Sequence, residues 1–281
     1  MHRQPRLRLL DSPSNVEIGP ATFRVITFKL ILEYEGTRYS GWQDQKNART
    51  VMGELLKAAG QVFRGKFEMQ GAGRTDAGVH ALGQVMHLQV EGEVPEQPHE
   101  LQRRLNELLP ADIVILQLVR ARRTFHARHD AESRVYVYQI SKRKQAFTKK
   151  HVWWVKEPLD VEAMARCAAM VVGRHDFVCF RALDASRPHE STVVEVASAE
   201  IESEDDIIQF RIEASHFIWR MVRRIVGVLV KVGKGEIAEA DFAKLIAGRS
   251  DPKLDVAAWT APASGLFLEH VRYSERDGKS I

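Results

Sequence analysis

The 281-residue chain has few cysteines and no long apolar run. Cys167 and Cys179 are its two cysteines, and they do not form a Cys-x-x-Cys pair. This argues against a disulfide framework or a zinc ribbon and is typical of a protein in a reducing cytosol. No apolar stretch approaches the roughly 18 residues of a membrane-spanning helix. We therefore expect a cytoplasmic protein that has no membrane as a partner.

The sequence also lacks the motifs of common cofactor sites. It contains no P-loop, and in the Gly-x-Gly of Gly71 and Gly73 the third glycine of a dinucleotide fingerprint is replaced by Asp76. His126 and His129 lie next to Asp130, but the sequence indicates no further ligand set, so ordinary histidines are the better interpretation. We expect no cofactor and no metal ion.

Charge is present in both signs but is unevenly placed. The net charge is +4, and 28% of the residues are charged. Residues 120–150 contain ten Lys/Arg and two acids, whereas residues 190–206 contain seven acids and no Lys/Arg. A basic stretch attracts phosphate and an acidic one does not. Taken alone, this pattern indicates two solvated faces of a globular protein.

The hydrophobic periodicity predicts two similar series of elements. In the first half, strands are expected at 25–33, 67–70, 84–90 and 113–119, with helices at 50–63 and 100–109. In the second half, strands are expected at 133–140, 192–202, 207–214 and 266–271, with helices at 161–172, 217–232 and 238–247. The repeated order of strand, helix, strand, strand, helix, strand is that of a ferredoxin-like fold.

This order predicts an α/β (α+β) protein made of two ferredoxin-like antiparallel halves. We place the first domain at 25–122 and the second at 123–281. Residues 1–24 are largely polar, lean basic and contain three prolines, so they are expected to form a flexible N-terminal extension.

A glycine-rich segment at 71–90, GAGRTDAGVHALGQVMHLQV, carries the most chemical information. Glycines allow a tight turn and the close approach of another molecule, and Arg74 and Asp76 lie on that turn. One interpretation is a solvated loop with a local ion pair of little energetic weight. The other is a catalytic carboxylate whose ionised form is held by an arginine.

The predicted helix at 217–232 has one apolar and one basic face. Its basic side contains Arg220, Arg223, Arg224 and Lys231, together with Gly227. This side could be a solvated surface, or it could face phosphates or an active carboxylate. The glycine would let an RNA backbone or another element of the protein come close.

RTDAGVHA at 74–81 resembles the signature of the bacterial tRNA pseudouridine synthase A family. Further segments resemble the family in the same order along the chain: EYEGTRYSGW at 33–42, followed by Gln43, RTVMGEL at 49–55, FHARHDAESRVYVY at 125–138, GRHDFVCF at 173–180, FIWRMVRRIVG at 217–227 and PASGLFL at 262–268. The resemblance therefore covers nearly the whole chain.

The resemblance implies an isomerase that converts uridine to pseudouridine in the tRNA anticodon stem-loop, at positions 38–40 of the tRNA. It implies a homodimer and a catalytic cleft between the two halves. Asp76 would carry out the chemistry, Arg74 and Arg223 would hold its charge, and Tyr136 would pack on the uracil. From the residues alone, a core tyrosine on a half-buried strand is the preferred interpretation of Tyr136.

Basic residues near these segments are predicted to bind RNA. They are Arg220 and Arg224 on the helix and Lys142, Arg143 and Lys144 after the fifth strand. In the family pattern, Arg220 replaces a smaller or less basic residue and Arg224 an Asn, while Glu35 replaces an Asp and Met52 a Gln. None of these departures removes a catalytic group, and the two additional arginines concern substrate preference more than activity.

Two alternatives to this function stay open. The same chemistry could act on another RNA, because the catalytic residues would be the same. A non-catalytic RNA-binding protein of the same fold would use its basic segments for phosphate and its tyrosines for stacking. Such a binder has no use for Asp76, because a carboxylate that faces RNA repels phosphate.

Overall fold

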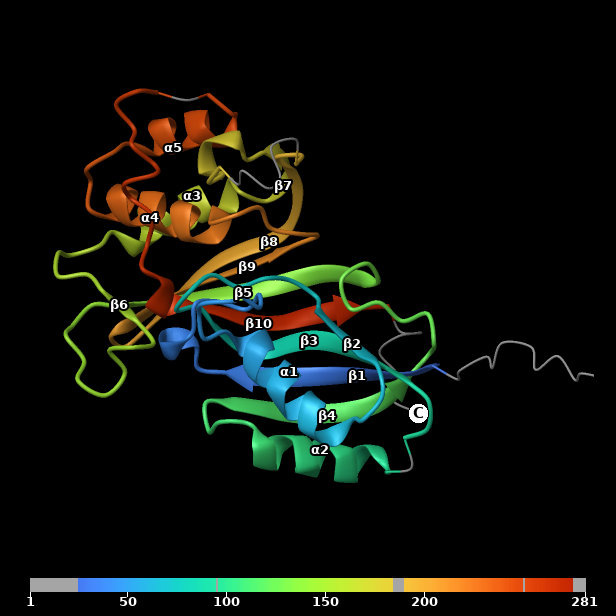
Figure 1. Ribbon diagram of the computed structural model, residues 1–281. Helices are drawn as coiled ribbons and strands as arrows, with labels where there is room; N and C mark the ends of the chain where they lie inside the picture. Colours follow the sequence, from blue (N-terminus) through green and yellow to red (C-terminus); the bar gives the residue numbers. More distant parts are fainter. Residues whose placement is uncertain (1–24, 95, 184–189, 250, 275–281) are drawn as a thin grey trace, which may run out of the picture.

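The computed structural model describes residues 25–94, 96–183, 190–249 and 251–274 (Figure 1). The predicted extension at 1–24 lies outside these residues. No helix among the described residues is long and apolar enough to cross a membrane.

The first half contains four strands and two α-helices. They are β1 (Val25–Tyr34), α1 (Val51–Val62), β2 (Phe67–Gly71), β3 (His80–Glu91), α2 (Pro98–Leu108) and β4 (Ile113–Ala121). Thr50 caps α1, because its hydroxyl accepts the Gly53 N–H at 3.1 Å. Met86, Leu88 and Val90 are all buried, so this side of β3 faces the core.

The described residues of the second half form six strands and three α-helices. They are β5 (Ala131–Ser141), β6 (Trp153–Trp154), α3 (Val161–Ala169), β7 (Gly173–Asp176), β8 (Val193–Glu204), β9 (Ile207–Ala214), α4 (Met221–Gly233), α5 (Glu239–Ile246) and β10 (Leu266–Tyr273). Short 3₁₀ turns lie at Gly36–Arg38, Val178–Phe180 and Ala263–Gly265.

The two halves have the same strand order and share one sheet. The described strands run β4-β1-β3-β10-β5-β9-β8-β7, with β2 paired to β3 and β6 to β5. The first half thus has the order β4-β1-β3-β2 and the second β10-β5-β9-β8, which is the ferredoxin-like arrangement in each. The predicted fold class is confirmed.

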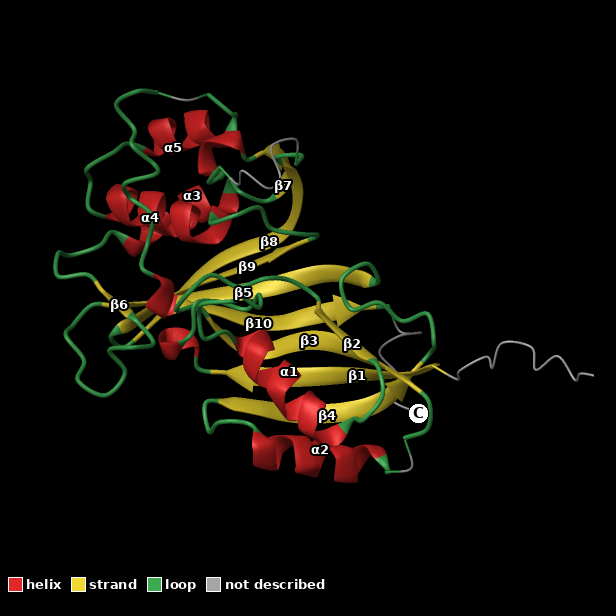
Figure 2. Ribbon diagram, in the orientation of Figure 1, coloured by secondary structure: helices red, strands yellow, loops and turns green. Residues whose placement is uncertain are grey.

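The last strand of the chain joins the halves. Strand β10 pairs antiparallel with β5 and, over Phe267 and Leu268, parallel with His80 and Ala81 at the start of β3. The sheet is therefore continuous across the molecule, with α1 and α2 over one end and α3, α4 and α5 gathered at the other (Figure 2). The domain boundary at 122/123 stays a prediction.

Helix α4 differs in two ways from the prediction. It begins at Met221 rather than at 217, because Arg220 adopts a left-handed conformation with φ of 62° that ends the regular backbone. Its apolar face is buried as expected, and Gly227 is also buried. A Cβ on Gly227 would lie 1.8 Å from the Trp259 carbonyl oxygen, so another segment of the protein, and not RNA, approaches this glycine.

The segment at 175–177 has a packing role at the edge of the sheet. His175 and Asp176 belong to β7, which pairs antiparallel with β8, and Phe177 is fully buried after the strand.

Candidate active site

The loop that connects β2 to β3 presents Asp76 and is anchored from both sides. The Trp42 N–H donates to the Thr75 carbonyl at 3.1 Å, and the Ala72 N–H donates to the Val85 carbonyl at 2.7 Å. The Thr75 hydroxyl is buried against the Tyr34 hydroxyl at 2.8 Å. Burial raises the pKa of Tyr34 to about 12, so this pair is neutral at physiological pH. The loop therefore holds Asp76 in a fixed place.

The close approach of the Trp42 ring explains why residue 71, before the loop, is a glycine. A Cβ on Gly71 would lie 2.6 Å from the Trp42 ring, which is itself almost completely buried. The loop can lie flat on the indole only because residue 71 has no side chain. Trp42 thus supports the segment that carries Asp76.

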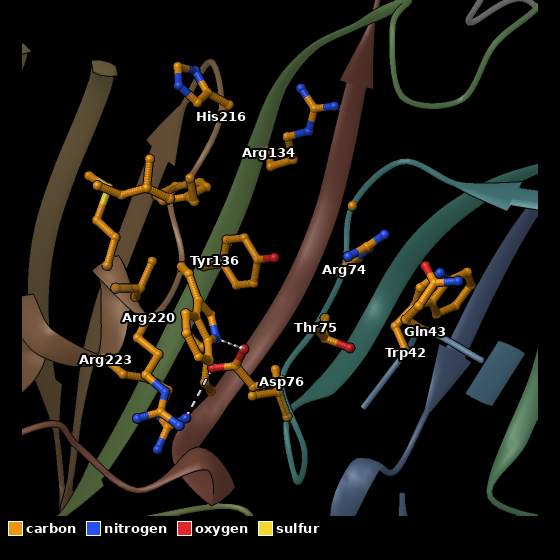
Figure 3. Close-up of a pocket in the computed structure, with 18 of the residues that line it drawn as sticks. Trp42, Gln43, Arg74, Thr75, Asp76, Arg134, Tyr136, His216, Arg220 and Arg223 are labelled. Carbon is orange, nitrogen blue, oxygen red and sulfur yellow. Dashed lines mark hydrogen bonds and ion pairs between the residues drawn. The ribbon is translucent and has the colours of Figure 1, made fainter. Parts of the chain in front are cut away.

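Two residues of the second half bind the Asp76 carboxylate. Arg223 Nη1 lies 3.0 Å from Oδ2, and Trp219 Nε1 donates to Oδ1 at 3.1 Å; dashed lines in Figure 3 mark both contacts. Arg223 is held in turn by the Ala261 carbonyl, to which Nε donates at 2.7 Å. The Asp76 side chain is 25% exposed and that of Arg223 is 15% exposed, so water screens this ion pair only in part. The predicted pairing of Arg223 with Asp76 is present.

Tyr136 lies beside this pair on β5. It is 9% exposed and packs edge-to-face on Phe217, with ring centroids 4.9 Å apart. Burial raises its pKa, so the phenol stays protonated. In Figure 3 the ring faces the same space as the Asp76 carboxylate.

These residues line one cavity of about 510 Å³. The first half contributes Trp42, Gln43, Arg74 and Asp76, and the second contributes Arg134, Tyr136, His216, Arg220 and Arg223 (Figure 3). The cavity therefore lies between the two halves, where the cleft was expected. Its volume falls in the range of sites that enclose a small molecule or one nucleotide.

Arg74 does not pair with Asp76, contrary to the prediction. Its side chain is exposed, lines the cavity and is directed away from the carboxylate (Figure 3). Within the described part of the chain, no carboxylate forms an ion pair with it. The two residues are neighbours on the loop, but the turn sends their side chains in different directions.

The two additional arginines of α4 have different surroundings. Arg220 is exposed at the cavity, and its guanidinium lies over the Trp219 ring at 4.9 Å. Arg224 is partly buried and donates to the Arg181 carbonyl, its Nε is buried with no hydrogen-bond partner among the described residues, and burial lowers its pKa. Arg220 remains available to RNA, whereas Arg224 is engaged inside the protein and does not fit the predicted RNA contact.

The basic residues at 142–144 are exposed but lie outside the cavity lining. Lys142 donates to the Ser203 hydroxyl at 3.3 Å, Arg143 pairs with Asp206, and Lys144 lies over the Trp154 ring at 5.9 Å. The sequence did not reveal these partners. They do not prevent a contact with phosphate, because all three side chains stay accessible to solvent.

The prediction missed two residues that the geometry places at the centre of the site. One is Trp219, whose contact with Asp76 depends on a turn that periodicity does not reveal. The other is Arg134, which donates to the carbonyls of Ala72 at 3.0 Å, Arg128 at 2.8 Å and Ser215 at 2.8 Å. It thereby ties the loop that carries Asp76 to the second half. The sequence feature that could have indicated this role is the arginine of the Arg-x-Tyr-x-Tyr segment on a half-buried strand.

One group of possible metal ligands lies outside the cavity. Glu35, His80 and His151 have ligand atoms within 4.8 Å of one another. However, Nδ1 of His80 accepts the Gly36 N–H at 3.0 Å and Nε2 is 3.0 Å from the Lys150 carbonyl. Both ring nitrogens are therefore used within the protein, and the group fits a structural role better than a metal site.

Comparisons with known proteins agree with this geometry. A family model described as tRNA pseudouridine synthase matches residues 30–130 and 167–274. The chain belongs to the tRNA pseudouridine synthase family. It is thus an isomerase, as the motifs at 74–81 and 217–227 predicted.

Individual members of the tRNA pseudouridine synthase family match over most of their length. The tRNA pseudouridine synthase A of Thermoanaerobacter sp. (strain X514) is 38% identical over 246 residues, which are 87% of this chain and 98% of that protein. That of Acetivibrio thermocellus is 39% identical over 247 residues, with 87% and 98% covered. A protein of Bacillus anthracis named tRNA pseudouridine synthase A 2 is 34% identical over 249 residues, with 88% and 99% covered.

Proposed function

We propose that this protein isomerises uridine to pseudouridine in the anticodon stem-loop of tRNA, with Asp76 as the catalytic residue. The observation that supports this most strongly is the position of Asp76. It lies in a cavity between the two halves, on a loop of one half, with its charge balanced by Arg223 of the other half.

The chemistry requires an ionised carboxylate near the sugar of the target nucleoside. The bond between ribose C1′ and uracil N1 breaks, the base turns, and a new bond forms to C5. Asp76 acts either as a nucleophile or as a base at C2′. Arg223 favours the ionised form because it offsets the loss of hydration in the cavity.

The uracil must leave any base stack and find a surface in the cavity. Tyr136 provides an aromatic ring at the required place, and its edge contact with Phe217 holds that ring still. Arg74 and Arg220 are exposed at the cavity and are suited to the phosphates that flank the flipped nucleotide.

A cytoplasmic homodimer is part of the proposal. The basic residues at 142–144 are far along the sequence from the catalytic loop and lie outside the cavity lining. A second subunit would allow one tRNA to contact both the cavity of one chain and the basic residues of the other. Sedimentation of the purified protein without tRNA shows whether it is a dimer, and sedimentation with tRNA shows how many tRNA molecules the dimer binds.

Mapping of pseudouridine in total RNA from cells with and without the gene tests the substrate. We expect pseudouridines of the tRNA anticodon stem-loop to disappear with the gene and to return with a wild-type copy. Loss of sites in another RNA alone would show the same chemistry on a different substrate. Unchanged pseudouridine everywhere, together with tRNA binding by the purified protein, would indicate the non-catalytic alternative.

A further inference from the structure

Trp219 occupies an unusual place for an aromatic residue of this size. It follows β9, precedes α4, and is 40% exposed at the edge of the cavity. Its indole N–H nevertheless points inward and donates to Asp76 Oδ1 at 3.1 Å. The Trp219 main chain is fixed as well, because its carbonyl accepts the Ala182 N–H at 3.0 Å.

The backbone next to Trp219 is strained in a way that favours this contact. Arg220 has φ of 62°, a conformation that residues with a Cβ rarely adopt, and no side chain caps the start of α4 there. Strained residues persist where the surrounding structure requires them and are frequent at active sites. Trp219 and Arg223 lie on opposite sides of this turn, and both reach the same carboxylate.

We infer that Trp219 is a positioning residue that fixes the orientation of the Asp76 carboxylate. Arg223 alone binds one oxygen, which leaves the carboxylate free to rotate about its last bond. A second donor on the other oxygen fixes the carboxylate plane and leaves lone pairs for the sugar. An indole N–H suits this task because it does not titrate and accepts no hydrogen bond. Arg220, over the ring at 4.9 Å, restricts the indole in turn.

This inference rests on the proposed catalytic role of Asp76, and Trp219→Phe tests it because it keeps a ring and removes the donor. Trp153→Phe is the matched control, since Trp153 is a partly exposed tryptophan that lies outside the cavity lining. The single-turnover rate at saturating enzyme should fall about tenfold in Trp219→Phe, the loss expected for one hydrogen bond to a charged group. The affinity for tRNA should stay the same, and Trp153→Phe should keep the wild-type rate.

The difference between the effects on chemistry and on binding supplies a readout that a general loss of packing would not give. The single-turnover rate of Trp219→Phe should fall, while its tRNA affinity and melting temperature stay at the wild-type values. A wild-type rate in Trp219→Phe would overturn the inference.

A measurement without catalysis separates this inference from the proposed function. The fluorescence of Trp219, taken as the difference between wild type and Trp219→Phe, should change in an Asp76→Ala background, because that substitution removes the acceptor of the indole N–H. If the wild type forms no pseudouridine, the proposed function fails, while this comparison still decides whether the contact exists. A difference spectrum that is the same in the Asp76→Ala background would refute the contact itself.

Discussion

Replacement of Arg223 by alanine removes the charge that balances Asp76. The two groups are 3.0 Å apart at their nearest atoms, and their side chains are 15% and 25% exposed. Unit charges about 4 Å apart interact by ~4 kcal/mol at an effective dielectric constant of about 20. Solvent screening at this partly exposed pair reduces that interaction to about 1 kcal/mol. Arg223→Ala should therefore slow single-turnover pseudouridine formation by about fivefold.

Single-turnover rates measured at saturating enzyme provide the assay, because they exclude effects on tRNA affinity. Arg223→Lys is the matched variant: it keeps a cation but loses the donor to the Ala261 carbonyl. We expect a smaller loss of rate for lysine than for alanine. If Arg223→Ala instead weakens tRNA binding while the single-turnover rate stays at the wild-type value, Arg223 contacts phosphate and the charge-balance argument is refuted.

Three further predictions concern RNA binding and stability. Changing all three basic residues at 142–144 to alanine should weaken tRNA binding and make the affinity less dependent on salt, with a smaller effect on the rate of chemistry on bound tRNA. An unchanged salt slope in filter-binding measurements would exclude this segment from the RNA interface. His87 is buried and its Nδ1 accepts a backbone N–H, so burial lowers its pKa to about 4 from the ordinary 6.5. The unfolded chain therefore binds a proton that the folded chain does not bind, and the free energy of unfolding falls as the pH drops from 6.5 towards 4. In urea titrations, His87→Asn should reduce this loss of stability by about 2–3 kcal/mol. A pH dependence identical to that of the wild type would disprove the role of His87. Gly227→Ala should destabilise the fold by ~2–3 kcal/mol because its Cβ would meet the Trp259 carbonyl. Gly60→Ala is the control: Gly60 faces open space on α1, so this variant should be neutral or slightly stabilising. Equal melting temperatures for the two variants would contradict this packing.

Local patterns account for much of the fold because each acts over a few residues. Helix α1, strand β3 and the apolar face of α4 all lie where periodicity predicts them. The meeting of Arg223 with Asp76 follows from a helix face together with a family resemblance, since no local rule joins residues that are so far apart in sequence.

The predictions are wrong where contacts with distant segments determine the surroundings of a residue. Arg224 and Gly227 belong to the basic side of α4, but the backbone near Arg181 and Trp259 packs on that side. A helical wheel does not show which other segments pack on a helix. Arg74 was paired with Asp76 by adjacency, yet the turn directs the two side chains apart (Figure 3). Trp219 reaches Asp76 only through the left-handed residue that follows it.

The catalytic role of Asp76 is tested most directly by the single-turnover formation of pseudouridine in a tRNA transcript by wild type and Asp76→Asn. Asparagine keeps the size of the side chain and its contact with Trp219 but removes the charge. We predict no detectable product from Asp76→Asn, with melting temperature and tRNA affinity close to wild type. Pseudouridine formed by Asp76→Asn at the wild-type rate would contradict the assignment of this carboxylate as the catalytic group.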